Sequence, residues 1–300
     1  MTASTAFGKV ILLGEHSVVH GRPALAAAVS TCAEAVATAS DSLSMHVRPW
    51  GATFRPDDGS DLGRALGVLA SHLGVDRASV DLTLHLPGGG GLGSSAAMGV
   101  ACARALAAME GRALDDASLL DAALAWEKVF HGNPSGVDHT LAAMGGVGVY
   151  VKGEGFTRVP LRAPLRLCIG DTGERASTRA MVEGVARQLE RQREATERTF
   201  DAIATLVRNA RLALEAGDLK TVGDMMNLNQ HLLASLLLST ERVEALCAAA
   251  RDAGALGAKL TGAGGGGCVL ALASDVEGER AVLDAWRHIG ATGAAVEVGA

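Results

Sequence analysis

The chain has 300 residues, 48% of them hydrophobic, and its 27 lysines and arginines against 33 acidic residues give a formal net charge of −6. These values fit a globular protein of two medium lobes and exclude a disordered chain. No run of basic residues marks a nucleic-acid binder, and the short N-terminal apolar run is neither a signal peptide nor a membrane span, so we expect a cytoplasmic protein without nucleic-acid or membrane partners.

The first half of the chain shows both strand and helix patterns. Apolar runs and strict alternation of apolar and polar residues predict strands, whereas apolar residues spaced three and four apart predict helices. The predicted elements are a strand at 8–13, a helix at 61–74, a strand at 80–86, a helix from Ser94 to near Gly111, and a helix from Asp115 or Asp116 to His131. The glycines and proline of HGNPSG end the last helix.

The second half continues the mixture without the strict alternation of a doubly wound parallel sheet. Its predicted elements are strands at 145–151 and 165–172 around a turn-rich joint, helices through 177–251 with a break at 215–218, strands at 256–260 and 267–273, a helix at 281–289 and a strand at 294–298. We therefore expect the α+β class, with one lobe at 1–160 and a second at 161–300.

Cysteine and lysine are both scarce. The cysteines are odd in number, scattered and without zinc-site spacing, so buried thiols in a reducing compartment are expected. They are Cys32, Cys102, Cys168, Cys247 and Cys268. Lysine stands only at positions 9, 128, 152, 220 and 259, so each lysine merits individual inspection.

Residues 86–97 read LPGGGGLGSSAA, between a predicted strand and a predicted helix. A glycine-rich turn into a helix N-terminus offers free backbone N–H groups and the positive end of the helix dipole to an anion. The hydroxyls of Ser94 and Ser95 suit a helix cap, a phosphate contact or a magnesium ligand. A Walker A loop would need a lysine before its serine, and this stretch has none. A dinucleotide-binding fold would need a second parallel strand after the helix, where a second helix is predicted. A flexible linker would not need its glycines placed between a strand and a helix. We predict a phosphate-bearing ligand.

Two carboxylates and a lysine are candidates for the chemistry. Asp138 follows a turn in which Asn133 suits a helix cap and Pro134 the first helical position. Glu127 would lie about 16 Å from Asp138 on one continuous helix, but the break lets both converge on one phosphate and metal centre. A buried Lys9 would need Asp138 or a phosphate as its partner. The plain alternatives are that Asp138 caps a helix, that Glu127 is a solvated helix charge and that Lys9 lies at a strand edge.

Glu15 and His16 directly follow the first predicted strand, in a loop position suited to a small polar substrate. A purely structural role stays open for His16, as it does for His20 and His131. The glycines at 262–267 again invite close approach of a ligand, or else they form a tight hairpin without one.

Three motifs, taken in this order, resemble the GHMP family of small-molecule kinases. They are GKVILLGEHSVVHGRPALA at 8–26, PGGGGLGSSAA at 87–97 and KLTGAGGGGC at 259–268. HGNPSGVDHT at 131–140 resembles the branch that phosphorylates mevalonate. The resemblance implies transfer of the ATP γ-phosphate to the 5-hydroxyl of mevalonate in isoprenoid biosynthesis. The reaction would take place in a cleft between a lobe like ribosomal protein S5 domain 2 and a C-terminal α/β lobe.

The resemblance also implies roles for individual residues. Asp138 would take the hydroxyl proton or orient the nucleophile, and Lys9 would pair with it and stabilise charge on the transferred group. Ser95 and Glu127 would hold Mg²⁺. ATP would lie against Pro87, Gly88, Gly89, Gly90, Gly91, Leu92, Gly93, Ser94 and Ser95. Mevalonate would contact Lys9, Glu15, His16, Asp138, Thr178 and Gly264.

Three positions depart from the family pattern and bear on substrate contacts. Leu13 stands where many members carry a polar residue, Ser17 where alanine is usual, and His139 where asparagine is common. The alternatives are a phosphomevalonate, mevalonate 3-, galactose or homoserine kinase, the related diphosphomevalonate decarboxylase, and a non-catalytic nucleotide sensor. The resemblance suggests a homodimer but implies nothing firm about feedback by prenyl diphosphates.

Overall fold

Backbone contacts divide the chain into two compact units, each built from separate segments. The computed structural model describes residues 3–85, 91–131 and 134–299. Unit 1 comprises Met1–Lys9, Ala28–Gly88 and Gly93–Gly145, and unit 2 comprises Val10–Ala27, Gly89–Leu92 and Gly146–Ala300. The division cuts two strands, β1 (Ser4–Leu13) and β2 (Ala24–Thr38). The lobe boundary expected near residue 160 stays a prediction.

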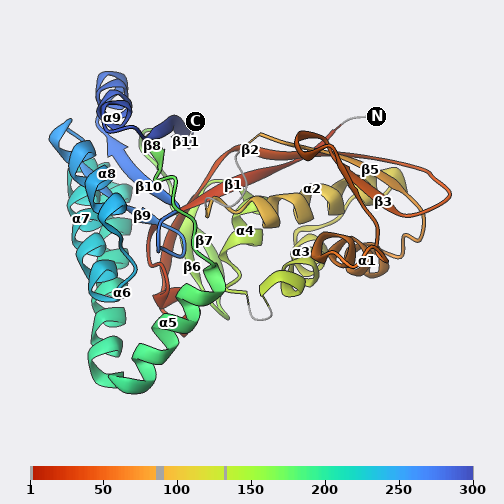
Figure 1. Cartoon of the computed structure of the whole chain (residues 1–300), viewed down its shortest axis with the longest axis horizontal. Coiled ribbons are helices and arrows are strands. Elements are labelled where there is room, and N and C mark those ends of the chain that lie inside the picture. The colour runs from red at the N-terminus through yellow and green to blue at the C-terminus, as the bar shows by residue number, and fades with distance from the viewer. Residues whose placement is uncertain (1–2, 86–90, 132–133, 300) are drawn as a thin grey trace. The chain divides into compact units, whose positions relative to one another are not determined.

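Unit 1 combines a sheet with a group of helices (Figure 1). The strands, in spatial order, are β4 (Ala52–Phe54), β3 (Ser44–Val47), β5 (Ser79–Leu84) and the second half of β2. β3 runs parallel to β5, and the other neighbours are antiparallel. The helices are α1 (Asp61–Leu73), α2 (Ser94–Met109), α3 (Asp116–His131) and α4 (Val137–Met144).

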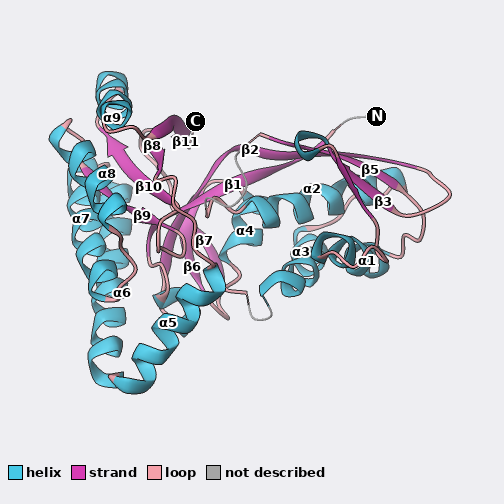
Figure 2. Ribbon diagram, in the orientation of Figure 1, coloured by secondary structure: helices cyan, strands magenta, loops and turns pink. Residues whose placement is uncertain are grey.

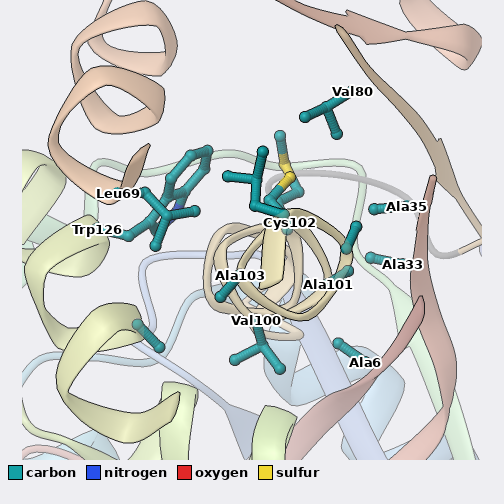
Figure 3. Close-up of a cluster of buried hydrophobic side chains, with 14 of the residues drawn as sticks. Ala6, Ala33, Ala35, Leu69, Val80, Val100, Ala101, Cys102, Ala103 and Trp126 are labelled. Atoms are coloured by element: carbon teal, nitrogen blue, oxygen red, sulfur yellow. The ribbon is translucent and has the colours of Figure 1, made fainter. Parts of the chain in front are cut away.

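Helix α2 is the centre of this unit. Figure 3 looks along it, with Ala33 and Ala35 of β2 on one side and Trp126 of α3 on another. Nearly every residue from Ala96 to Ala107 is buried, as expected of a helix that is apolar all round. Its alanines let the sheet and the neighbouring helices approach closely, and this packing fixes the position of the helix N-terminus.

Unit 2 contains two groups of strands, five α-helices and a short 3-10 helix, Ser17–His20, among its described residues. The first half of β2 pairs with β6 (Val147–Val151), which pairs with β7 (Gly155–Arg158). A second, antiparallel sheet has the order β11 (Thr292–Val298), β8 (Leu165–Asp171), β10 (Cys268–Ala273), β9 (Gly257–Thr261). The helices are α5 (Thr178–Arg191), α6 (Arg193–Ala216), α7 (Leu219–Ser235), α8 (Glu241–Asp252) and α9 (Val276–His288). α7 and α8 pack on β9, and α9 packs on β8 and β11 (Figure 2).

The expected α+β class is confirmed, and most predicted elements are present. The helical stretch 177–251 is broken at 215–218 as predicted, where Gly217 ends α6 and Asp218 caps α7. It is broken twice more, at Gln192 and at 236–240, where no glycine or proline marks the chain. The sequence analysis also missed the strands β2, β3, β4 and β7.

Some expectations about helix starts are wrong. Helix α4 begins at Val137 after Gly136, so Pro134 does not take a first helical position. Asn133 lies outside the described residues. Helix α2 begins after Gly93 and has no side-chain cap, so neither Ser94 nor Ser95 caps it.

Two expectations from composition can be compared with the structure. All five cysteines are buried free thiols, as predicted. Within the described ranges, no helix has both the length and the hydropathy needed to cross a membrane.

Candidate active site

A buried lysine and a partly exposed aspartate form an ion pair in unit 1. Lys9 lies on β1 and is 4% exposed. Its Nζ atom is 2.8 Å from Oδ1 of Asp138, in the first turn of α4. Gly136 precedes this helix with a φ of 98°, a backbone conformation that side chains other than glycine's rarely adopt. Of the two partners considered for Lys9, the structure shows Asp138.

Glu127 comes to the same part of unit 1 through the packing of α3 on α2. The indole Nε1 of the preceding residue, Trp126, donates a hydrogen bond to the carbonyl of Ser95 at 3.0 Å. The Ser95 hydroxyl in turn donates to Oε1 of Glu127 at 2.8 Å. The Nε2 atom of His131, one turn further along α3, lies 3.8 Å from Oε2 of Glu127. The carboxylate is therefore held against the start of α2.

Burial and a second negative charge shape the chemistry of Glu127. Its side chain is nearly inaccessible, and this burial raises the pKa to about 7. The charge of Asp138 raises the pKa as well, whereas the Ser95 hydrogen bond and the charge of Lys9 lower it. The side chains of Lys9, Glu127 and Asp138 therefore lie close enough for their charges to interact. Their convergence on one phosphate and metal centre stays a prediction.

The glycine-rich segment reaches this site at Gly93. Of the residues assigned to ATP, Pro87, Gly88, Gly89 and Gly90 lie outside the described residues. Gly93 has a φ of 76°, and a Cβ there would lie 2.9 Å from Cγ of Lys9. The main chain therefore passes directly beside the lysine. Gly93 directly precedes α2, and the positive end of a helix dipole favours an anion at that N-terminus.

Glu15 and His16 belong to unit 2, in the turn after β1. Glu15 is almost completely buried, forms an ion pair with the equally buried Lys259, and accepts a hydrogen bond from Nδ2 of Asn229 at 3.2 Å. His16 has a φ of 60°, and its Nε2 atom lies 2.8 Å from the carbonyl oxygen of Ala263. Burial lowers the pKa of His16, which favours the neutral ring.

The remaining substrate candidates lie in unit 2 as well. Thr178 is the exposed first residue of α5. Gly264 has a φ of 80°, and a Cβ there would lie 2.5 Å from the carbonyl oxygen of Leu238, so the turn needs glycine. His20 stacks on Phe200, with ring centroids 4.8 Å apart, and this contact supports its structural reading.

The three departures from the family pattern lie in the interior. Leu13 is fully buried, and the Ser17 hydroxyl donates to the carbonyl of Gly14 at 3.1 Å. His139 is 6% exposed, and its Nδ1 atom has no hydrogen-bond partner. Burial lowers the pKa of this histidine. Leu13 and Ser17 thus complete the local packing.

Sequence analysis missed two residues of this region, Lys259 and Asn229. The scarcity of lysine and the position of Lys259 just before a glycine cluster were the only signals for it. Asn229 lies in α7 and carried no signal of its own.

Two family patterns match the chain. The family pattern described as GHMP kinases N terminal domain matches residues 61–146, and that described as GHMP kinases C terminal matches residues 210–291. The mevalonate kinase of Aeropyrum pernix is 37% identical over 92% of this chain and 90% of its own. The chain belongs to the GHMP kinase family.

Within the GHMP kinases, its relatives of known structure share the whole fold. A crystal structure of L. major mevalonate kinase in complex with R-mevalonate superposes with a TM-score of 0.86 at 29% identity, over 99% of this chain and 96% of that one. Streptococcus pneumoniae phosphomevalonate kinase has a TM-score of 0.84 at 21% identity, over 98% of this chain and 100% of that one, which shows the fold alone.

Proposed function

We propose that this GHMP kinase transfers the γ-phosphate of ATP to the 5-hydroxyl of mevalonate, giving 5-phosphomevalonate and ADP in isoprenoid biosynthesis. The observation that carries the proposal is the ion pair of Lys9 and Asp138 beside Gly93. Phosphoryl transfer needs positioning and charge neutralisation, and a carboxylate, a cation and a helix N-terminus supply both. The identity to mevalonate kinases supports the choice of substrate.

Asp138 and Lys9 have complementary roles in this reaction. The Asp138 carboxylate orients the 5-hydroxyl and takes its proton while the new bond to the γ-phosphorus forms and the bond to ADP breaks. Lys9 neutralises Asp138 before the reaction and stabilises negative charge on the transferred phosphoryl group. Its burial keeps water from competing for that charge.

Ser95 and Glu127 are the residues that we assign to Mg²⁺. Both offer oxygen, which Mg²⁺ prefers, and the Ser95 hydroxyl already touches the carboxylate at 2.8 Å. The described residues hold no group of three or more His, Cys, Asp or Glu side chains suited to a metal. Sites of one or two protein ligands completed by substrate phosphates are usual for this ion, so the residues fit. The bound ion supplies neutralisation of the ATP phosphates.

The remaining assignments rest on the family resemblance. The segment from Pro87 to Ser95 would hold the ATP phosphates, and His16, Thr178 and Gly264 would contact mevalonate. A division into lobes at residue 160, a cytoplasmic location and a homodimer belong to the same proposal.

A substrate panel tests the function. Purified protein is assayed for ADP release with mevalonate, phosphomevalonate, diphosphomevalonate, galactose and homoserine, and the product is examined by phosphorus NMR and for CO₂ release. We expect turnover with mevalonate and a phosphate ester at the 5-position. Turnover of another substrate, a 3-phosphate product or release of CO₂ would each replace the proposal with the corresponding relative.

A further inference from the structure

Unit 2 contains a fully buried ion pair that the proposed chemistry does not use. Lys259 on β9 is 0% exposed and Glu15, in the turn after β1, is 1% exposed. The Nζ atom of Lys259 contacts Oε1 of Glu15 and also donates to the main-chain carbonyls of Ile11, at 3.3 Å, and Leu260. Taking two charges out of water is expensive, so such a pair is weak support for stability alone.

Two further side chains belong to this network. The Nδ2 atom of Asn229 on α7 donates to Oε2 of Glu15 at 3.2 Å. The Thr261 hydroxyl accepts from the Ile11 N–H at 3.0 Å and donates to the Ile11 carbonyl at 3.3 Å. We call Glu15, Lys259, Asn229 and Thr261 the Glu15 clamp. Both carboxylate oxygens of Glu15 therefore have partners inside the protein.

The clamp lies directly beside a strained residue. His16 follows Glu15 and has a φ of 60°, which is uncommon for a residue other than glycine. Such strain persists only where the surrounding structure holds the residue in place. The clamp fixes the turn on one side, and the hydrogen bond to Ala263 holds the ring on the other.

The hydrogen bond to Ala263 also determines the tautomer of His16. A carbonyl oxygen only accepts, so Nε2 must carry the proton. In the neutral ring Nδ1 then has a lone pair and no proton. The ring is thereby prepared to accept a hydrogen bond from an alcohol.

We propose that Lys259 is a positioning residue for the substrate: through Glu15 it holds His16 so that Nδ1 accepts a hydrogen bond from a hydroxyl of the alcohol. Glu15 then acts through His16 and is not itself a substrate ligand. This inference rests on the proposed function and adds to it which residues prepare the substrate contact. Lys259 contacts Glu15, which directly precedes His16, so its loss should affect the alcohol selectively.

Kinetics of Lys259→Met test the proposal. Without the lysine, we expect KM for mevalonate to rise by up to about tenfold, the loss expected for one neutral hydrogen bond, while KM for ATP changes less than about twofold. Lys220→Met, an exposed lysine of α7, should leave both constants unchanged. Leu246→Ala, a fully buried position of α8 outside the clamp, controls for lost stability.

Two other variants cover the case in which a single buried charge prevents folding. Lys259→Met combined with Glu15→Gln removes both charges and keeps the side-chain volumes, and Asn229→Ala removes one neutral partner. The proposal expects both to raise KM for mevalonate selectively. The clamp would have only a structural role if KM for mevalonate and KM for ATP changed equally. The same would follow if KM for mevalonate rose no more than in Leu246→Ala at a matched loss of melting temperature.

The ring of His16 gives a measurement that does not depend on turnover. NMR of the protein with 15N-labelled histidine reports the tautomer of each ring. The His16→Asn variant identifies the signal of His16 among the nine histidines. We expect one Nε2–H tautomer in the wild type and in Leu246→Ala, and averaged tautomers in the clamp variants. An unchanged His16 signal in those variants overturns the inference even if mevalonate is the substrate. Absence of turnover with mevalonate overturns the proposed function instead.

Discussion

The Nζ atom of Lys9 lies 2.8 Å from Oδ1 of Asp138, and the two side chains differ in exposure, 5% for the lysine and 33% for the aspartate. The cation is held in the interior while its carboxylate still reaches the surface of unit 1. Asp138 is therefore able to meet an incoming hydroxyl group, and Lys9 fixes its position without being displaced by water. This asymmetry gives the two residues different expected responses to substitution.

Replacing Asp138 with asparagine should greatly lower the catalytic rate and leave nucleotide binding almost unchanged. Asp138→Asn keeps the shape but does not take a proton, so we expect kcat to fall about a thousandfold with near-normal Mg·ADP affinity. Steady-state kinetics and calorimetry measure the two quantities. Asp116→Asn, which changes an exposed first-turn carboxylate of α3, serves as the control. Activity within tenfold of the wild type would end the assignment of Asp138.

Lys9 should not tolerate either the loss of its charge or a change in its shape. We expect kcat to fall at least about a hundredfold in Lys9→Met, because negative charge on the transferred phosphoryl group loses its partner. Lys9→Arg should also be impaired, since a planar guanidinium does not replace a compact ammonium in a buried site. Lys128→Met, at an exposed position of α3, is the matched control. Full activity in both Lys9 variants would make Lys9 a structural lysine.

Alanine at Gly93 tests the phosphate-binding role of the glycine segment. Its Cβ would lie 2.9 Å from Cγ of Lys9, and the φ of 76° is unfavourable for alanine. We expect Gly93→Ala to weaken Mg·ADP binding about tenfold, or by about 1.4 kcal/mol. Gly111 has a similar φ of 68° but open space around it, so Gly111→Ala matches the strain without the collision. Equal affinities of the two variants by calorimetry would mean that the segment only connects two elements.

Stability without metal should depend on pH through Glu127. Its pKa is raised from 4.5 to about 7, so the folded state keeps a proton that the unfolded state releases near pH 4.5. The resulting contribution to the free energy of unfolding is complete below pH 4.5 and is lost as the pH rises to about 7. We expect the difference in unfolding free energy between the wild type and Glu127→Gln to fall over this range.

Urea unfolding of both proteins at several pH values measures that difference. The buried histidines titrate in both proteins, so their contributions cancel in the comparison. Added Mg²⁺ should stabilise the wild type mainly above pH 7, where the carboxylate is free to bind it. A difference that does not change between pH 4.5 and 7 would contradict the burial of a protonated Glu127.

Local sequence patterns were sufficient to predict most helices and to name Asp138 as one of two candidate partners of Lys9. They failed where distant packing decides the structure. β2 is rich in alanine, which is depleted in strands, yet Ala33 and Ala35 are buried against α2, where larger side chains would keep the sheet and the helix apart. The pairing of Glu15 with Lys259 joins residues 244 positions apart, and no local rule connects them.

The separation of Glu15 and Lys259 along the chain determines when the two partners can first meet during synthesis. Glu15 leaves the ribosome with the first segment of the chain, whereas its cation follows 244 residues later. At an elongation rate of about 5 to 20 residues per second, the delay is roughly 10 to 50 seconds. The Thr261 hydroxyl, which binds the main chain of Ile11, is synthesised after a similar delay. The nascent apolar strand Val10–Leu13 therefore lacks both of these partners for most of translation, although β2, with which β1 pairs, follows it directly.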